Sequence, residues 1–181
     1  MTGESETTTL GGGCFWCIEA VFKELAGVGK VQPGYSGGKG DDADYESVSS
    51  GKTGHAEVVQ ITYDPDVLTF REILEVFFEA HDPTTQDRQG ADIGSQYRSV
   101  IFYHDEGQRR IAEDLVGELD ASGRWESPVV TQVVPYEAFY PAEKYHEDYY
   151  ENNPNQPYCR LVIEPKVSNV RKHFKEKLRA R

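Results

Sequence analysis

Cysteine is the residue type in this sequence that is best placed to do chemistry. Two of the three cysteines lie in the segment GGGCFWC, where Cys14 follows three glycines at the expected start of a helix. Free backbone N–H groups and the positive end of the helix dipole favour a thiolate there, so we expect Cys14 to be a nucleophile. Cys17 lies one turn further along. Most free cysteines are small buried hydrophobes, which is the alternative for all three, Cys159 included.

The Cys-x-x-Cys spacing of Cys14 and Cys17 also fits a dithiol redox pair or half of a zinc site. A structural zinc site needs a second pair of ligands, and only Cys159 and scattered histidines remain, so we expect no metal. Phe15 and Trp16 stand directly beside Cys14. Two large rings next to a reactive thiol can form an apolar cup for a small group such as a methyl, although core packing explains them equally well.

A carboxyl group lies on the apolar face of a strand predicted over residues 55–63. Strand alternation places Glu57 on the same face as Val59, Ile61 and Tyr63. We therefore expect Glu57 to be buried, and burial raises the pKa of a carboxyl towards the range in which it donates a proton near pH 7. The alternative is a structural ion pair with an arginine such as Arg98.

Two tyrosines and an aspartate are candidate partners of Glu57. Tyr45 lies in a long polar loop before the strand, Tyr97 is expected to open a later strand, and Asp92 precedes Tyr97 by five residues. A phenol can hydrogen-bond a polar oxygen that a protonated Glu57 also contacts. Packing is the alternative for any one of the 11 tyrosines, and we expect it for the histidines, which lack metal-ligand spacing: His55, His81, His104, His146 and His173.

The elements that must position these residues follow from hydrophobic period and turn signals. Strands are predicted over 7–10, 28–35, 55–63, 97–103 and 128–134, and helices over 14–25, 70–78, 106–121 and 142–150. Thr69 and Glu72 form a capping box before the second helix. The βαββαβ order is that of a ferredoxin-like α+β arrangement, in which helices cover one face of the sheet.

The chain is expected to form one catalytic domain over residues 1–181. Residues 1–6 should be flexible, and 151–181 should form an irregular C-terminal coil and a terminal helix, with an apolar stripe of Val170, Phe174 and Leu178. The 31 acidic and 19 basic residues give a net charge of −12, which argues against binding to nucleic acid or to an anionic membrane. The first ten residues show no secretion signal, so we expect a cytoplasmic protein.

Four segments of the sequence match one known family. They are GCFWC (13–17), DYESVSSGKTGHAEVV (44–59), HDPTTQDRQGADIGSQYRS (81–99) and EKYHEDYYENNPNQPYC (143–159). In these segments, and in the order of the helices between them, the chain resembles the peptide methionine sulfoxide reductases of the A type. The resemblance covers nearly the whole chain. It implies a two-layer α+β sandwich with a ferredoxin-like core, a mixed sheet and a long C-terminal coil.

The resemblance also implies a reaction. Cys14 would attack the sulfur of a methionine S-sulfoxide whose methyl group lies between Phe15 and Trp16. The sulfoxide oxygen would be held by Glu57, Tyr45 and Tyr97. Glu57 would donate the proton, with Asp92 supporting the site. Methionine would then leave, and Cys14 would remain as a sulfenic acid.

A resolving thiol would next form a disulfide with Cys14, which thioredoxin or another dithiol would reduce without any bound cofactor. Cys159, in NNPNQPYC, matches the place of the resolving cysteine in many members of the family, and Cys17 is the alternative. The implied substrates are oxidised proteins and peptides, together with free methionine sulfoxide, and we expect a monomer. Two other functions stay open: a thioredoxin-like thiol–disulfide oxidoreductase using Cys14 and Cys17, and a noncatalytic module that binds methyl-sulfur groups.

Overall fold

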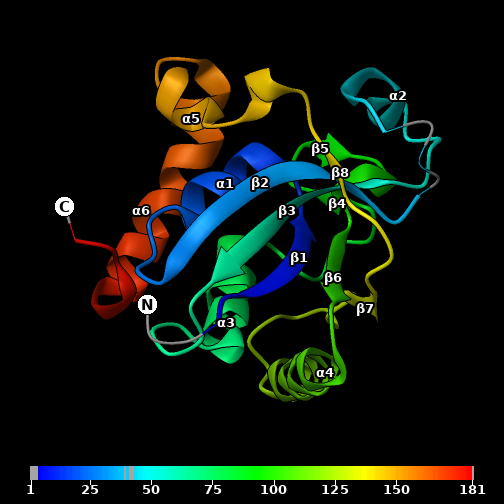
Figure 1. The fold of residues 1–181 in the computed structure, drawn as a ribbon. Coiled ribbons are helices and arrows are strands. Elements are labelled where there is room, and N and C mark those ends of the chain that lie inside the picture. The colour runs from blue at the N-terminus through cyan, green and yellow to red at the C-terminus, as the bar shows by residue number, and fades with distance from the viewer. Residues whose placement is uncertain (1–3, 39, 41–42, 181) are drawn as a thin grey trace.

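The computed structural model describes residues 4–38, 40 and 43–180. In this part of the chain, six strands form one sheet in the order β7-β6-β1-β3-β2-β8 (Figure 1). Neighbouring strands are antiparallel except for the parallel pair β6 and β7, so the sheet is mixed, as expected. The strands are β1 (Glu6–Gly12), β2 (Val28–Ser36), β3 (Ala56–Tyr63), β6 (Ser99–Tyr103), β7 (Gln132–Pro135) and β8 (Tyr140–Pro141).

The four central strands confirm the predicted ferredoxin-like core. Helix α1 (Phe15–Phe22) lies between β1 and β2, and helix α3 (Phe70–Ala80) lies between β3 and β6. The chain therefore runs βαββαβ, and its strands lie side by side in the order β6-β1-β3-β2. Both helices pack on the sheet face that carries Val59 and Ile61, which makes this face the interior of a two-layer sandwich.

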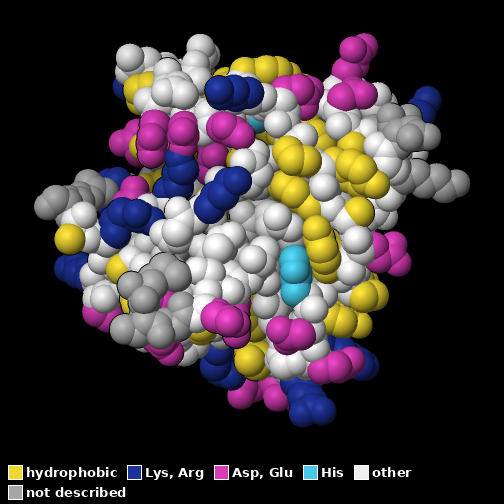
Figure 2. Space-filling view, viewed as in Figure 1, with side chains coloured by type: hydrophobic (Ala, Val, Ile, Leu, Met, Phe, Trp, Pro, Cys, Tyr) yellow, Lys and Arg dark blue, Asp and Glu magenta, His cyan; other side chains and the backbone are white. Residues whose placement is uncertain are grey.

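Residues of β3 alternate between two hydrophobic clusters, as the sequence pattern predicts. Val59 and Ile61 belong to the main core with α1, α3 and α6 (Glu164–His173). Ala56 and Val58 belong to a smaller cluster, which is covered by partly buried side chains of β7 and of the connection from β7 to β8, namely Val134, Tyr136 and Phe139. Figure 2 shows hydrophobic side chains gathered on that side of the molecule, over β8 and the connection leading to it.

The helices predicted in the middle of the chain begin where their capping residues lie. The capping box at the start of α3 is confirmed, because Thr69 accepts from the Glu72 amide and the Glu72 carboxylate accepts from the Thr69 amide. Helix α4 (Glu106–Ala121) has the predicted bounds, and the Asp105 side chain accepts from the Gln108 amide at its start. Both caps satisfy N–H groups that a helix leaves unpaired.

The two long polar loops contain more regular structure than predicted. They carry the short elements α2 (Tyr45–Ser49), β4 (Arg88–Gln89) and β5 (Asp92–Ile93). Tyr97 does not open a strand. It ends a 3₁₀ turn (Ser95–Tyr97) that follows Gly94, whose φ of 140° allows the chain to bend, and β6 begins only at Ser99.

The aromatic helix predicted over 142–150 is wrong. The chain instead forms a 3₁₀ turn (Lys144–His146) and the single-turn helix α5 (Tyr149–Asn152). Asp148 between them has a left-handed backbone with φ of 54°, through which a right-handed helix cannot continue. We call residues 143–152 the strap, because several of its residues contact α1 through side chains or backbone amides.

The C-terminal segment, predicted over 151–181 as an irregular coil followed by a terminal helix, is helical earlier than expected. A π-helical stretch over Cys159–Ile163 leads into α6, which ends at His173. Leu178 lies beyond the helix and forms a β-bridge with Leu25. One helical stripe therefore cannot hold all three residues that the pattern assigned to it, Val170, Phe174 and Leu178.

The N-terminal segment expected to be flexible includes residues 1–3, which lie outside the described residues. Glu6 of that segment is the first residue of β1 and pairs with Tyr63 of β3. The Tyr63 hydroxyl also donates to the Glu6 carboxylate at 2.9 Å. The strand therefore begins one residue before the predicted 7–10.

Candidate active site

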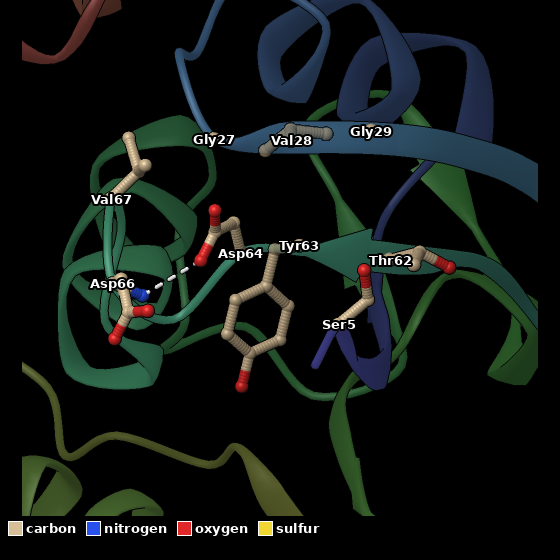
Figure 3. A pocket seen from close by; sticks show the side chains of 9 residues that line it. All are labelled: Ser5, Gly27, Val28, Gly29, Thr62, Tyr63, Asp64, Asp66 and Val67. Carbon is tan, nitrogen blue, oxygen red and sulfur yellow. Dashed lines mark hydrogen bonds between the residues drawn. The ribbon is translucent and has the colours of Figure 1, made fainter. Parts of the chain in front are cut away.

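A hollow of about 590 Å³ lies where β3 ends (Figure 3). Its lining includes Tyr63, Asp64 and Asp66, and the Asp64 carboxylate already accepts a hydrogen bond from the Asp66 amide at 3.0 Å. No cysteine or histidine is among the residues that line it, and none of the residues singled out from the sequence as site residues is there. Those residues lie at the opposite end of β3.

The turn between β1 and α1 places Cys14 near the start of β3. Gly13 in this turn has a left-handed backbone with φ of 96°, and a Cβ atom there would lie 2.7 Å from the Gln89 side chain. Only glycine meets both conditions without strain. The turn makes Cys14 the N-cap residue of α1, and 7% of its surface is exposed.

Glu57 is buried, as the alternation along β3 predicts, with 1% of its surface exposed. Its Oε1 atom accepts a hydrogen bond at 3.1 Å from the Phe15 amide, one of the free N–H groups at the start of α1. Burial raises the pKa of Glu57 to about 8, so the carboxyl is largely protonated at pH 7. Arg98, the alternative ion-pair partner, instead donates to the carbonyl oxygens of Ser95 and Gly54.

The two thiols of the Cys-x-x-Cys pair share a hydrogen bond, which raises the pKa of Cys14 and lowers that of Cys17. Burial, Cys17 and the nearby Glu57 raise the pKa of Cys14 well above its usual value, and the Trp16 amide offsets only part of this. The hydrogen bond from Cys14 lowers the pKa of Cys17 to about 7, with a contribution from Lys166 of α6. The prediction that the helix N-terminus makes Cys14 the more acidic thiol is therefore wrong, because burial and its neighbours disfavour a charge on its sulfur.

Tyr45 and Tyr97 lie near the same carboxyl and thiol. Burial, together with Glu57 and Cys14, raises the pKa of Tyr45 to about 12. Burial, Glu57, Asp92 and Cys14 also raise the pKa of Tyr97. Both phenols therefore keep their protons at neutral pH and can donate hydrogen bonds to an oxygen atom beside Glu57. Two polar loops that are distant in the sequence thus supply hydrogen-bond donors to one place.

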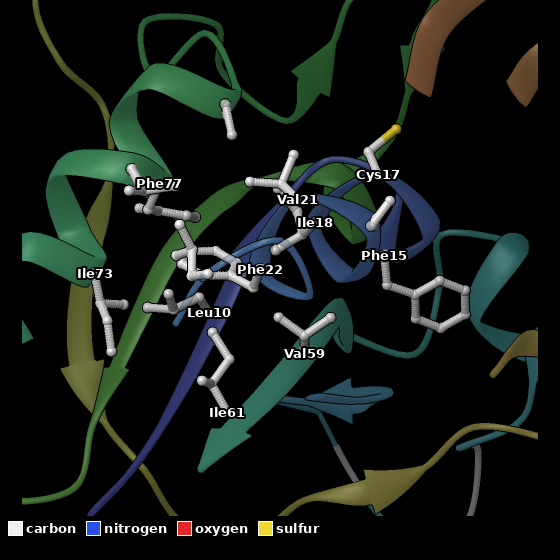
Figure 4. Packing of buried hydrophobic residues seen from close by; sticks show 14 of the residues in the cluster. Leu10, Phe15, Cys17, Ile18, Val21, Phe22, Val59, Ile61, Ile73 and Phe77 are labelled. Carbon is white, nitrogen blue, oxygen red and sulfur yellow. The ribbon is translucent and has the colours of Figure 1, made fainter. Parts of the chain in front are cut away.

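Asp92 connects this place to the C-terminal segment. Its Oδ2 atom accepts a hydrogen bond from the Tyr158 hydroxyl at 2.7 Å, and the same hydroxyl lies 3.7 Å from the Cys17 sulfur. The next residue, Cys159, is buried, and burial and Cys17 raise the pKa of its thiol. In Figure 4 the Cys17 sulfur points towards the orange ribbon of the C-terminal segment. Asp92 also contributes to the raised pKa of Glu57.

Three aromatic rings, those of Phe15, Trp16 and Tyr45, gather beside Cys14 and form what we call the aromatic wall. The ring centroids of Phe15 and Trp16 are 6.4 Å apart, and that of Tyr45 lies 6.5 Å from Phe15 and 6.3 Å from Trp16. Phe15 is also a buried member of the hydrophobic core (Figure 4), whereas Trp16 is half-buried. Phe15 therefore packs in the hydrophobic core and also forms part of the aromatic wall beside the Cys14 thiol.

The strap adds two more rings to the aromatic wall. Tyr149 stacks on Trp16 with ring centroids 3.7 Å apart and 7° between the planes. The Trp16 indole N–H donates to Nδ1 of His146 at 3.0 Å, and the His146 ring lies 4.6 Å from that of Tyr45. Among the described residues, Nε2 of this buried imidazole has no hydrogen-bond partner. His146, expected to be a packing residue, is therefore part of the site.

Glu143 anchors the start of the strap. Its two carboxylate oxygens accept hydrogen bonds from the Tyr35 hydroxyl and the Tyr45 amide, each at 3.0 Å. These contacts tie the strap and α2 to β2. Periodicity did not single out the site residues of the C-terminal third, because they are common polar and aromatic types in irregular segments. Only the family-matched run EKYHEDYYENNPNQPYC points to them, namely Glu143, His146, Tyr149 and Tyr158.

The described residues contain no group of three or more His, Cys, Asp or Glu side chains arranged to hold a metal ion. In the same part of the chain, no helix combines the length and the apolar content needed to cross a membrane. Cys14, Cys17 and Cys159 are all free thiols.

The sequence is similar to known proteins over nearly its whole length. The family model described as peptide methionine sulfoxide reductase matches residues 6–178. The peptide methionine sulfoxide reductase MsrA of Sulfolobus acidocaldarius is 58% identical over 172 residues, which cover 95% of this chain and 97% of that protein.

Solved structures share the fold as well. Mxr1 from Saccharomyces cerevisiae in reduced form has a TM-score of 0.80 and 32% identity, and the match covers 88% of this chain and 91% of that chain. Mxr1 in complex with Trx2 has a TM-score of 0.55 and 25% identity, with 82% and 87% covered. These likenesses confirm the predicted fold class.

Proposed function

The chain belongs to the peptide methionine sulfoxide reductase family and is therefore an oxidoreductase that reduces methionine sulfoxide, and we propose that Cys14 and Glu57 carry out this reaction on the S-sulfoxide. The observation that carries this assignment is the hydrogen bond between the Phe15 amide and Glu57, which holds a protonated carboxyl at the end of α1 where Cys14 lies. Attack on sulfur with protonation of oxygen needs a nucleophile and an acid in one place.

The attack begins with loss of the Cys14 proton. The hydrogen bond to Cys17, whose pKa is about 7, offers a neighbouring thiolate that can accept this proton. The Cys14 sulfur attacks the sulfoxide sulfur, Glu57 protonates the oxygen as the S–O bond breaks, and the hydroxyl group passes to Cys14. Two electrons move from the cysteine sulfur to the sulfoxide. The products are methionine, a Cys14 sulfenic acid and an ionised Glu57.

Other residues of the site hold the substrate for this step. Tyr45 and Tyr97, which keep their protons, donate hydrogen bonds to the sulfoxide oxygen. Asp92 supports the site because it helps to keep Glu57 protonated. The substrate methyl group lies against the apolar rings next to the nucleophile, those of Phe15 and Trp16.

We propose Cys159 as the resolving cysteine. Its thiol attacks the Cys14 sulfenic acid, water leaves, and a disulfide between the two cysteines forms. The hydrogen bond between Tyr158 and Asp92 supports this role, because it holds the residue next to Cys159 at the site. Thioredoxin or another dithiol then reduces the disulfide. The complex of yeast Mxr1 with Trx2 supports thioredoxin as this partner.

Cys17 is the second candidate for the resolving cysteine, and its hydrogen bond to Cys14 favours it. Mass spectrometry can distinguish Cys159 from Cys17 as the resolving cysteine. The disulfide is mapped after one equivalent of a methionine S-sulfoxide peptide is added without reductant. We expect a Cys14–Cys159 disulfide. A Cys14–Cys17 disulfide as the end product would assign the role to Cys17, and a Cys17–Cys159 disulfide would show that both thiols act in turn.

The biological setting is also part of the proposal. We place the protein in the cytoplasm as a monomer that repairs oxidised proteins and peptides and also accepts free methionine sulfoxide, with no bound cofactor. Three free thiols at the site, Cys14, Cys17 and Cys159, suit a compartment that keeps cysteines reduced. Light scattering on the purified reduced protein should give the mass of one chain, 20.4 kDa, and a larger mass would contradict the monomer.

The function is tested by incubating the protein with a peptide S-sulfoxide and a dithiol such as dithiothreitol. Release of methionine peptide from the S-sulfoxide, with the R-sulfoxide as the matched control substrate, is the expected result. Preference for the R-sulfoxide would contradict the stereochemical assignment. Binding of the sulfoxide without consumption would instead support the noncatalytic alternative.

A further inference from the structure

One buried carboxylate of α1 lies where the strap bends. Glu19 has 2% of its surface exposed, and its place three residues after Trp16 puts both side chains on the same side of the helix. Its Oε2 atom accepts a hydrogen bond from the Asp148 amide at 3.0 Å, and the Tyr149 amide also donates to this carboxylate. Buried carboxylates need such partners. Glu19 thus receives two consecutive backbone N–H groups of the strap.

Asp148 is the residue that this contact holds in place. Its backbone has φ of 54° and ψ of 32°, which costs a residue other than glycine about 1 kcal/mol or more. Lys23, the residue that caps the C-terminal end of α1, forms an ion pair with the Asp148 carboxylate. Glu19 and Lys23 therefore hold the backbone and the side chain of the same strained residue. Figure 2 shows acidic and basic side chains next to each other where α1, α5 and α6 meet.

The bend at Asp148 decides where the next side chain points. Tyr149 lies flat on Trp16, with 3.7 Å between the ring centroids. The Trp16 indole N–H is held by His146 on the other side of the bend. The stack and the hydrogen bond together determine the plane and the rotation of the indole, which is one side of the aromatic wall.

We propose that Glu19 is a positioning residue of the reductase: by binding the amides of Asp148 and Tyr149, it keeps the Tyr149 ring on Trp16 and so fixes the aromatic wall that receives the methyl group of the substrate. The role of the wall rests on the proposed function. Glu19 acts through these residues and takes no part in the proton transfers. Its removal therefore weakens substrate binding and leaves the chemical step intact.

Charged groups face Glu19 from each element packed around it. They are Lys23 and Glu24, which directly follow α1, Glu147, Asp148 and Glu151 of the strap, and Arg171 of α6. Most of these residues line a cavity of about 210 Å³ beside Glu19. Burial raises the pKa of Glu19 to about 7 despite the opposing effect of Lys23. Because an ionised carboxylate accepts stronger hydrogen bonds than a neutral one, the hold on the strap weakens as the pH falls through about 7.

The stack between Tyr149 and Trp16 can be measured directly by near-ultraviolet circular dichroism. All variants are made with Trp125→Phe, which leaves Trp16 as the only tryptophan. The difference between this protein and its Tyr149→Leu variant defines the signal of the stack. Glu151→Gln is the matched control, because Glu151 also faces Lys23, at 3.8 Å, but is exposed.

We expect Glu19→Ala to lose the stacking signal and to raise KM for a peptide S-sulfoxide about tenfold, while the single-turnover rate at saturating substrate stays within about twofold. Glu19→Gln keeps one acceptor oxygen and should retain most of the signal at pH 8. The signal of the parent protein should decrease from pH 8 to pH 6, and that of Glu19→Gln should not change. Glu151→Gln should behave as the parent in each measurement.

Several outcomes would overturn the proposal. These are an intact stacking signal in Glu19→Ala, a slower single turnover with unchanged KM, or equal changes in Glu151→Gln. If Glu19→Ala does not fold, the Glu19→Gln variant tests the proposal instead. A stacking signal that changes with pH in Glu19→Gln as much as in the parent would show that Glu19 does not control the stack. Failure of the parent protein to reduce sulfoxide would instead contradict the proposed function, since the optical signal is measured without substrate.

Discussion

The Phe15 amide donates a hydrogen bond to Glu57 Oε1 at 3.1 Å, so a carboxyl group from β3 occupies the N-terminal end of the helix that carries the reactive cysteine. A helix N-terminus stabilises negative charge. Burial outweighs this effect, and the pKa of Glu57 rises to about 8. The contact therefore places a proton donor, rather than a fixed negative charge, next to Cys14.

Replacing Glu57 by glutamine removes the acid and keeps an oxygen for the Phe15 amide. We expect the single-turnover rate with a methionine S-sulfoxide to fall by about 10²–10⁴, which is the usual contribution of general acid catalysis. Rapid-quench measurement of methionine released per enzyme checks this, with Cys14→Ser as the control that should release none. A Glu57→Gln variant as fast as the parent would rule out the acid role. It would also favour the alternative function, a thioredoxin-like thiol–disulfide oxidoreductase, because that mechanism does not use Glu57.

The pKa of Glu57 also predicts how stability depends on pH. Burial raises this pKa from its ordinary 4.5 to about 8, so the folded protein holds the proton more tightly than the unfolded chain. The resulting stabilisation is fully present below about pH 4.5 and is lost as the pH rises through 8, at about 1.4 kcal/mol per pKa unit. Urea unfolding between pH 5 and 9 should show a smaller loss of stability in Glu57→Gln. Parallel profiles for the two proteins would contradict the raised pKa.

Serine variants of the cysteines separate attack from recycling. Cys159→Ser should release about one methionine per enzyme in a single turnover and fail with thioredoxin, because the sulfenic acid forms but is not resolved. Cys17→Ser should keep thioredoxin-dependent turnover, with an attack about tenfold slower because the acceptor of the Cys14 proton is lost. Methionine release with thioredoxin, thioredoxin reductase and NADPH measures both. Full turnover by Cys159→Ser would move the resolving role to Cys17.

Two neighbouring rings of the aromatic wall should differ in what they contribute. Phe15 is buried in the core, so Phe15→Ala should lower the free energy of unfolding by about 3–5 kcal/mol through the lost packing and the cavity. Trp16 is half-buried, and Trp16→Ala should cost less stability but raise KM. Urea unfolding and steady-state kinetics measure the two effects, with Phe15→Leu as the conservative control. An unchanged KM in Trp16→Ala would exclude Trp16 from the binding site.

Local patterns in the sequence determine the features that depend on neighbouring residues along the chain. Period-two alternation is enough to bury Glu57, because the residues around it must face the core of a sandwich. The capping box of Thr69 and Glu72 sets the start of α3, since both hydrogen bonds lie within one turn. The four motif segments were sufficient to identify the family, because their residues keep a characteristic order and spacing.

Tertiary structure decided the features that depend on residues far apart in the chain. The hydrogen bonds of Trp16 with His146 and of Glu19 with Asp148 each span more than 120 positions, and no period in the sequence indicates them. The prediction of an acidic thiol at Cys14 is wrong for the same reason. A helix N-terminus is a local feature that lowers the pKa of a thiol, whereas burial is a property of the whole fold, and here it has the larger effect.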